Sequence, residues 1–222
     1  MRIGPFLSVA VFTLAGCIPE QGPNSPALPG NSVQDPRPMQ FSPAPLAWEQ
    51  GNPAAAGWST ELRAQIRARL EQFDQASDIA ALCPPYEGLS PDSRVEAIAA
   101  LAVAIARFES DYRPTLHFPE PGLGYDSIGL FQLSYEDNFS WCNLNRATNS
   151  LEDPITNIQC AIPEMATLIS RDGVIASGSD GGSARGLARY WSVVREGPTH
   201  RLAQITALTR ASPACSTANA AG

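Results

Sequence analysis

An almost uninterrupted apolar run from Val95 to Phe108 most constrains how this chain can fold. The triplet Ser90-Pro91-Asp92 before it is typical of a helix start, because serine can cap, proline fits the first turn and early negative charge suits the helix dipole. Apolar side chains lie on nearly every side of the expected helix, which indicates burial inside a domain. Arg113-Pro114 is expected to end the helix, since proline cannot continue its hydrogen-bond ladder.

Glu109 closes this run and is followed directly by Ser110. A carboxylate at the edge of an apolar helix loses part of its hydration, which disfavours its charged form and raises its pKa. A carboxyl group tuned in this way can donate a proton at neutral pH. The sequence therefore predicts that Glu109 is a general acid; the alternative is a solvated charge at a helix end.

The remaining pattern predicts an all-α or mostly α domain. Leu62, Ile66, Leu70 and Phe73 recur at helical spacing, with Ser59 placed to cap the helix start. No segment alternates for long between apolar and polar residues, as a strand would. The expected helices span 58–81, 129–138, 153–169 (with a kink or break at Pro163), 187–195 and 199–209, and the expected loops span 115–126 and 177–183.

A second conspicuous string, Ser127-Ile128-Gly129-Leu130-Phe131-Gln132, follows Glu109-Ser110 after a turn-rich stretch. With Asn157 and Tyr190 further on, these segments resemble, in order and separation, the catalytic signature of the soluble lytic transglycosylases in the lysozyme-like superfamily. The resemblance covers roughly residues 80 to 210.

The resemblance implies a lysozyme-like helical domain that cleaves the MurNAc–GlcNAc β-1,4 bond of peptidoglycan and forms 1,6-anhydroMurNAc. Glu109 would act first as acid and then as base, Tyr190 would bond its carboxylate, and Ser127 and Gln132 would line the sugar site. The expected partner is the glycan strand, bound by a monomer without cofactor. Alternatively, Tyr190 is a core aromatic residue and Gln132 braces the local structure.

The chain departs from the family pattern at two places. Asp126-Ser127 stands where Gly-Ala is usual, and Trp191 stands where Asn follows the tyrosine. If Asp126 lay about 6.5–9.5 Å from Glu109, it could activate water for an inverting hydrolase, with Glu120 as a weaker candidate for that role. A third possibility is a non-catalytic wall-binding lipoprotein.

The first residues are typical of an export signal. Arg2 is followed by an apolar stretch, Ile3 to Ala15, that is too short to span a bilayer as a mature helix. Leu14-Ala15-Gly16-Cys17 reads as a bacterial lipoprotein cleavage box, so residues 1–16 are expected to be removed and Cys17 lipidated. Ile18 in place of Asp favours the outer membrane, facing the periplasm. The alternative is an ordinary secretory signal with an incidental cysteine.

The segment 18–57 holds nine of the twenty prolines and is otherwise rich in small polar residues. Such a composition cannot bury enough apolar surface to offset its ordering entropy. We expect residues 17–57 to be a disordered tether, or else low-complexity sequence without a spacing role. A single catalytic domain is expected over 58–215, with a flexible tail over 216–222.

The charge and the cysteine content of the chain bear on nucleic-acid binding, on disulfides and on metal binding. The net charge is −7 and all fifteen basic residues are arginine, with no basic run to bind nucleic acid. Besides Cys17 the chain has an even number of cysteines, which favours disulfides in an exported protein. We predict Cys142–Cys160 and Cys83–Cys215, although three connectivities are possible. No metal site is expected, because no two cysteines have the spacing of zinc ligands.

Overall fold

The structure is a computed structural model that describes residues 43–137, 139–180 and 183–216. These residues belong to one compact unit that begins at Ser42. The predicted signal peptide, the lipidation site Cys17, residues 18–42 of the predicted tether and residues 217–222 of the predicted tail lie outside the described residues.

The described part is mostly helical, as predicted, with two short hairpins. The α-helices are α1 (Ala56–Arg67), α2 (Leu70–Phe73), α3 (Ile79–Leu82), α4 (Pro91–Ser110), α5 (Pro154–Asp172) and α6 (Leu202–Arg210). The strands are β1 (His117–Pro119), β2 (Asp126–Ile128), β3 (Ala176–Ser177) and β4 (Arg185–Gly186). Single 3-10 turns are η1 (Ala47–Glu49), η2 (Pro53–Ala55), η3 (Tyr86–Gly88), η4 (Arg146–Thr148), η5 (Ser150–Glu152), η6 (Leu187–Arg189) and η7 (Ser192–Val194).

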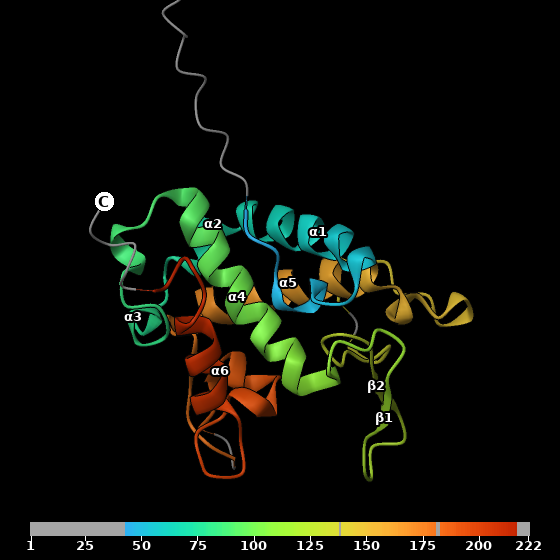
Figure 1. The fold of residues 1–222 in the computed structure, drawn as a ribbon. Coiled ribbons are helices and arrows are strands. Elements are labelled where there is room, and N and C mark those ends of the chain that lie inside the picture. Colours follow the sequence, from blue (N-terminus) through green and yellow to red (C-terminus); the bar gives the residue numbers. More distant parts are fainter. Residues whose placement is uncertain (1–42, 138, 181–182, 217–222) are drawn as a thin grey trace, which may run out of the picture. The chain divides into compact units, whose positions relative to one another are not determined.

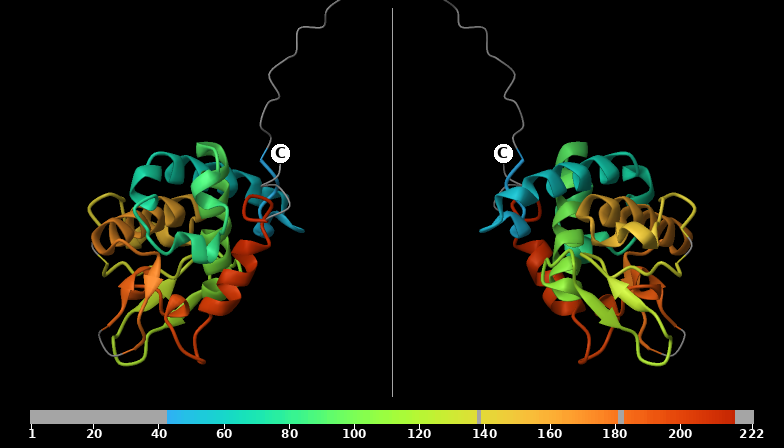
Figure 2. Two further views of the ribbon diagram at one scale, coloured as in Figure 1. Left: turned by 90° about the vertical axis from the view of Figure 1, so that its left-hand side faces the viewer. Right: turned by 90° about the vertical axis from the view of Figure 1, so that its right-hand side faces the viewer.

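Helix α4 is the centre of the fold. It packs against α1 and α6, while α5 packs against α1 and α2 (Figures 1 and 2). Eleven of its residues are buried, and they lie on nearly every side of the helix. This confirms that the apolar run is a buried helix, and it places Glu109 at the end of the most buried element.

Both ends of α4 have clear local causes. The Ser90 hydroxyl accepts a hydrogen bond from the amide of Ser93 (3.3 Å), which confirms the predicted cap. The helix ends at Ser110, three residues before Arg113-Pro114, because Asp111 and Tyr112 adopt left-handed conformations with φ of 53° and 61°. The predicted end was therefore too late.

The predicted helix 58–81 is wrong in detail, since α1, α2 and α3 share its range. Arg69 leaves the helical region, with φ of −129° and ψ of 16°, and separates α1 from α2. Ser59 is not a cap but lies inside α1, where its hydroxyl accepts a hydrogen bond from the indole of Trp48 (2.7 Å).

The end of the predicted tether is part of the folded unit. Trp48 is buried, and its ring packs edge-on against the rings of Trp58 and Tyr112, with centroids 5.9 and 6.3 Å apart. The boundary at 57 was therefore too late, because one large aromatic residue anchors a segment whose average composition is that of a linker.

Two further predictions need correction. The 115–126 segment contains β1 and part of the antiparallel β1–β2 hairpin, and 187–195 forms the turns η6 and η7 rather than a helix. Helix α5 begins as predicted, with Asp153 accepting from the amide of Thr156 (2.8 Å), but continues through Pro163. Pro163 is buried, and packing of α5 against α1 and α2 offsets the missing hydrogen bond.

The predicted disulfides are both present: Cys83–Cys215 and Cys142–Cys160. Disulfides persist in oxidising compartments, which indicates an extracytoplasmic location. No helix within the described ranges is long and apolar enough to cross a membrane. Among the same residues no group of three or more His, Cys, Asp or Glu side chains is arranged to hold a metal ion.

Candidate active site

A cleft of about 670 Å³ opens beside the C-terminal end of α4. Four parts of the chain form it: the end of α4, the β1–β2 hairpin, the segment 132–137 and the turns around 189–195. The lining residues are Phe108, Glu109, Phe118, Glu120, Leu123, Tyr125, Ser127, Gln132, Ser134, Asp137, Arg189, Tyr190, Trp191, Ser192 and Arg195. All four of the predicted cleft residues, Glu109, Ser127, Gln132 and Tyr190, are therefore brought together.

Glu109 is half-buried in this cleft. Burial, and secondly the negative charge of Glu120, raise the pKa of the Glu109 carboxyl from 4.5 to about 8. No described residue donates a hydrogen bond that would stabilise the charged form. At neutral pH the group is therefore largely protonated and able to give up its proton, as a general acid must be.

Among the described residues, Glu120 is one of three carboxylates that line the cleft, with Glu109 and Asp137. It follows β1, and its Oε1 accepts a hydrogen bond of 2.6 Å from the Ser127 hydroxyl. The hairpin fixes this pair, because Phe118 lies opposite Ser127 in the antiparallel register. Ser127 thus orients Glu120 from across the hairpin, a role that sequence spacing did not reveal.

The wall formed by residues 128–133 is not the helix that was predicted over 129–138. The buried Asn157 on α5 determines its shape: the side-chain amide accepts from the Phe131 amide (2.9 Å) and donates to the carbonyls of Ile128 and Leu151 (3.0 Å each). Gly129 has φ of +81°, and a Cβ there would lie 2.3 Å from the Asn157 Nδ2 atom. Only glycine fits this close approach.

Trp191 and Gln132 complete the same wall. The buried Trp191 indole donates to the carbonyl of Phe131 (2.9 Å), so the residue that departs from the family pattern serves as a core anchor. Gln132 lines the cleft, but its amide donates to the carbonyls of Gly129 (2.9 Å) and Leu116 (3.3 Å). Gln132 therefore braces the local structure, which was the alternative prediction for this residue.

Tyr190 lines the cleft but does not hydrogen-bond Glu109, contrary to prediction. Its hydroxyl donates to Asp137 (2.5 Å), which also accepts from the Ser134 amide (2.6 Å). Burial and the charge of Asp137 raise the pKa of Tyr190, and the charge of Glu109 adds to the same effect. Burial raises the pKa of Asp137, while the Tyr190 hydrogen bond opposes that rise. Sequence reasoning missed Asp137 altogether.

Asp126 is not among the described residues that line the cleft. It lies 3.2 Å from Nδ1 of His117, whose Nε2 is 3.1 Å from Glu152. The imidazole therefore bridges the base of the β1–β2 hairpin to η5. This arrangement gives Asp126 a structural partner and leaves Glu120 as the cleft carboxylate whose charge raises the pKa of Glu109.

Comparison with known proteins gives three solved structures of one protein, Bd0314 DslA of Bdellovibrio. The wild-type form is 28% identical, with a TM-score of 0.68 over 78% of this chain and 98% of that one. Two glutamate-to-glutamine mutants of DslA align with 29% and 28% identity and TM-scores of 0.69 and 0.67, each over 77% of this chain and 97% of that one. No family model and no curated protein matches the chain.

Proposed function

We propose that this protein is an enzyme that cleaves the glycan strand of peptidoglycan at the β-1,4 bond between MurNAc and GlcNAc, with Glu109 as general acid. The observation that carries this proposal is the half-buried Glu109, whose pKa of about 8 keeps it protonated at neutral pH inside a cleft. Breaking a glycosidic bond requires protonation of the leaving oxygen as an oxocarbenium-like centre forms. The ordered motifs of Glu109, Gly129, Asn157 and Tyr190 support the choice of substrate.

The first candidate reaction is that of a lytic transglycosylase. Glu109 protonates the glycosidic oxygen, and the C1–O bond breaks. The resulting carboxylate then takes the proton of the MurNAc 6-hydroxyl while O6 bonds to C1 and closes the 1,6-anhydro ring. No water enters, so one carboxylate suffices, and the raised pKa of Glu109 suits both of its roles.

The second candidate is hydrolysis, and Glu120 favours it. This carboxylate lines the same cleft as Glu109 and contributes to raising its pKa. The two substitutions in the DslA mutants are 11 residues apart in that protein, which is also the separation of Glu109 and Glu120. In this reaction Glu120 would take a proton from a water molecule whose oxygen bonds to C1. We therefore assign this role to Glu120 instead of Asp126, which was the first candidate from the sequence.

Product masses separate the candidates. Purified glycan strands, digested with the full chain and analysed by mass spectrometry, should give 1,6-anhydro ends from the transglycosylase and reducing ends, heavier by one water, from the hydrolase. Glu120→Gln should abolish only the hydrolytic products. Intact strands after digestion with folded wild-type protein would reject both reactions and leave the wall-binding alternative.

We further propose that Cys17 is lipidated and anchors the protein in the outer membrane, facing the periplasm. An acyl chain contributes about 0.8 kcal/mol for each buried methylene, so more than one chain gives stable anchoring. Cys17→Ser should release the protein from the membrane fraction while leaving cleavage of glycan strands unchanged. A variant that stays in the membrane fraction would contradict the anchor.

A further inference from the structure

A row of aromatic rings continues outward from the cleft. The ring centroid of Tyr190, in the cleft wall, lies 6.2 Å from that of Phe139, and the Phe139 ring stacks on Trp141 at 5.5 Å with only 22° between the planes. Trp141 is one of the few exposed large apolar residues in the described part of the chain, with 41% of its surface accessible. The row thus runs from a catalytic cleft to an exposed indole.

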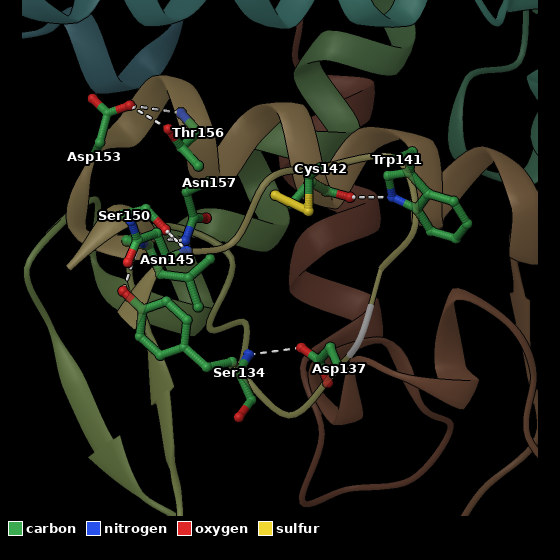
Figure 3. The surroundings of a disulfide bond; sticks show 12 residues. Ser134, Asp137, Trp141, Cys142, Asn145, Ser150, Asp153, Thr156 and Asn157 are labelled. Atoms are coloured by element: carbon green, nitrogen blue, oxygen red, sulfur yellow. Dashed lines mark hydrogen bonds between the residues drawn. A yellow bond between two sulfur atoms is a disulfide. The ribbon is translucent and has the colours of Figure 1, made fainter. Parts of the chain in front are cut away.

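The exposed indole is held in place rather than free to rotate. Its Nε1 donates to the carbonyl of Cys160 in α5 (3.2 Å), and the next residue, Cys142, is joined to Cys160 by a disulfide (Figure 3). One covalent bond and one hydrogen bond therefore fix the Trp141 segment to α5. An ordered, exposed aromatic surface costs hydration free energy in the unliganded protein, which is typical of a surface that binds a ligand.

Polar groups accompany the rings. Asp137 lines the cleft and accepts a hydrogen bond from the Tyr190 hydroxyl. Burial, and secondly the charge of Asp137, raise the pKa of Glu164 on α5. A wholly apolar partner would bury the remaining acceptor capacity of these carboxyl groups, at a cost. A pyranose ring has an apolar C–H face to lie on an aromatic ring and hydroxyl edges to donate to carboxylates. Nucleic acid offers stacking too, but the net charge of −7 opposes it.

We propose that Phe139 and Trp141 form a saccharide-stacking platform that extends the Glu109 cleft and binds pyranose rings of the glycan strand beyond the cleaved bond. The proposal rests on the proposed function for the identity of the strand, but binding at the platform does not require cleavage. The platform supplies affinity that is equal in the ground state and the transition state, so its loss should raise KM and leave kcat unchanged.

The test measures binding and cleavage separately, with the full chain and glycan strands freed of stem peptides. In the Glu109→Gln background, Trp141→Ala should raise the Kd for the strands about tenfold, which corresponds to about 1.4 kcal/mol, because the aromatic contact is lost. Trp141→Phe keeps a ring but not the indole N–H and should restore most of the affinity. Leu208→Ala, which removes an exposed apolar side chain on α6, is the matched control and should leave Kd unchanged.

The outcomes distinguish this proposal from the proposed function. If Trp141→Ala binds the strands within twofold of its parent, or if Trp141→Phe is as weak as Trp141→Ala, the platform is rejected even where the wild-type protein cleaves. If strands bind in a Trp141-dependent manner but the wild-type protein leaves them intact, the platform stands and the proposed enzymatic function fails.

Discussion

The hydroxyl of Ser110 donates a hydrogen bond of 2.9 Å to the carbonyl of Leu130, and so joins the residue after Glu109 to the loop that forms one wall of the cleft. Both residues are buried. The two residues of the Glu-Ser motif therefore have different roles. The Glu109 side chain lines the cleft, and the Ser110 side chain holds the loop at Leu130 in place.

Ser110→Ala should lower the free energy of unfolding by about 1–3 kcal/mol, because the buried carbonyl of Leu130 loses its donor. Urea denaturation measures this change. Thr60→Ala is the matched control, since the exposed Thr60 hydroxyl bonds the carbonyl four residues back, as the Ser110 hydroxyl also does with Ala106, and it should cost less than about 0.5 kcal/mol. Equal losses of unfolding free energy in the two variants would contradict a stabilising role for the hydrogen bond between Ser110 and Leu130.

Gly129→Ala should destabilise the protein far more than Gly122→Ala. Both glycines have positive φ, +81° and +78°, so alanine is strained at either position, by about 1–2 kcal/mol. At Gly122 nothing lies within 4 Å of the added carbon, whereas at Gly129 the Leu151 carbonyl lies only 2.5 Å away. We expect a loss of more than about 4 kcal/mol at Gly129, measured by urea denaturation. Similar losses at the two positions would contradict the close approach.

Structure that depends on local hydrogen bonds could be predicted from the sequence, and structure that depends on distant residues could not. The starts of α4 and α5 were predictable because their caps, Ser90 and Asp153, act through local hydrogen bonds. The wall at 128–133 was not, because its hydrogen bonds come from Asn157 and Trp191, which are distant in sequence.

The same distinction between local and long-range contacts applies to the candidate active site. Glu109 could be proposed from the apolar run before it, since a helix that is apolar on nearly every side must be buried. Asp137 and the hydrogen bond from Ser127 to Glu120 could not, because the β1–β2 hairpin and the turn at Tyr190 bring these side chains into the cleft only in the folded chain. Glu120 was only the weaker candidate beside Asp126. The folded state of Trp48 was missed for a similar reason, as its partners lie in α1 and beyond α4.

The raised pKa of Glu109 predicts a pH-dependent stability. Between 4.5 and about 8 the folded state holds a proton that the unfolded state releases, so the stability contributed by this group falls as pH rises through that window. Glu109→Gln should remove this dependence and make the variant the more stable protein at pH 9. Thermal unfolding from pH 4 to 9 measures the difference, and parallel curves for the two proteins would contradict the raised pKa.

The His117 bridge predicts a different pH dependence. Hydrogen bonding to Glu152, followed by Asp126, raises the pKa of His117 above 6.5, so its contribution is fully present below 6.5 and is lost as pH rises through the folded-state value. Protection factors for amide hydrogen exchange in the β1–β2 hairpin, which correct for the intrinsic rise of exchange with pH, should therefore fall above that value in the wild type, and His117→Gln should abolish the fall. His200→Gln, which alters a histidine paired with Asp180, should retain it. Protection factors that stay constant with pH in the wild type would reject the bridge.

The rate of glycan-strand cleavage by Glu109→Gln tests most directly whether Glu109 is the proton donor. The amide cannot protonate the leaving oxygen, so we predict a loss of about 10²–10⁴-fold in kcat. Glu71→Gln, which neutralises an exposed glutamate on α2, should cleave at the wild-type rate. A Glu109→Gln protein that retains cleavage within tenfold of wild type would contradict the account.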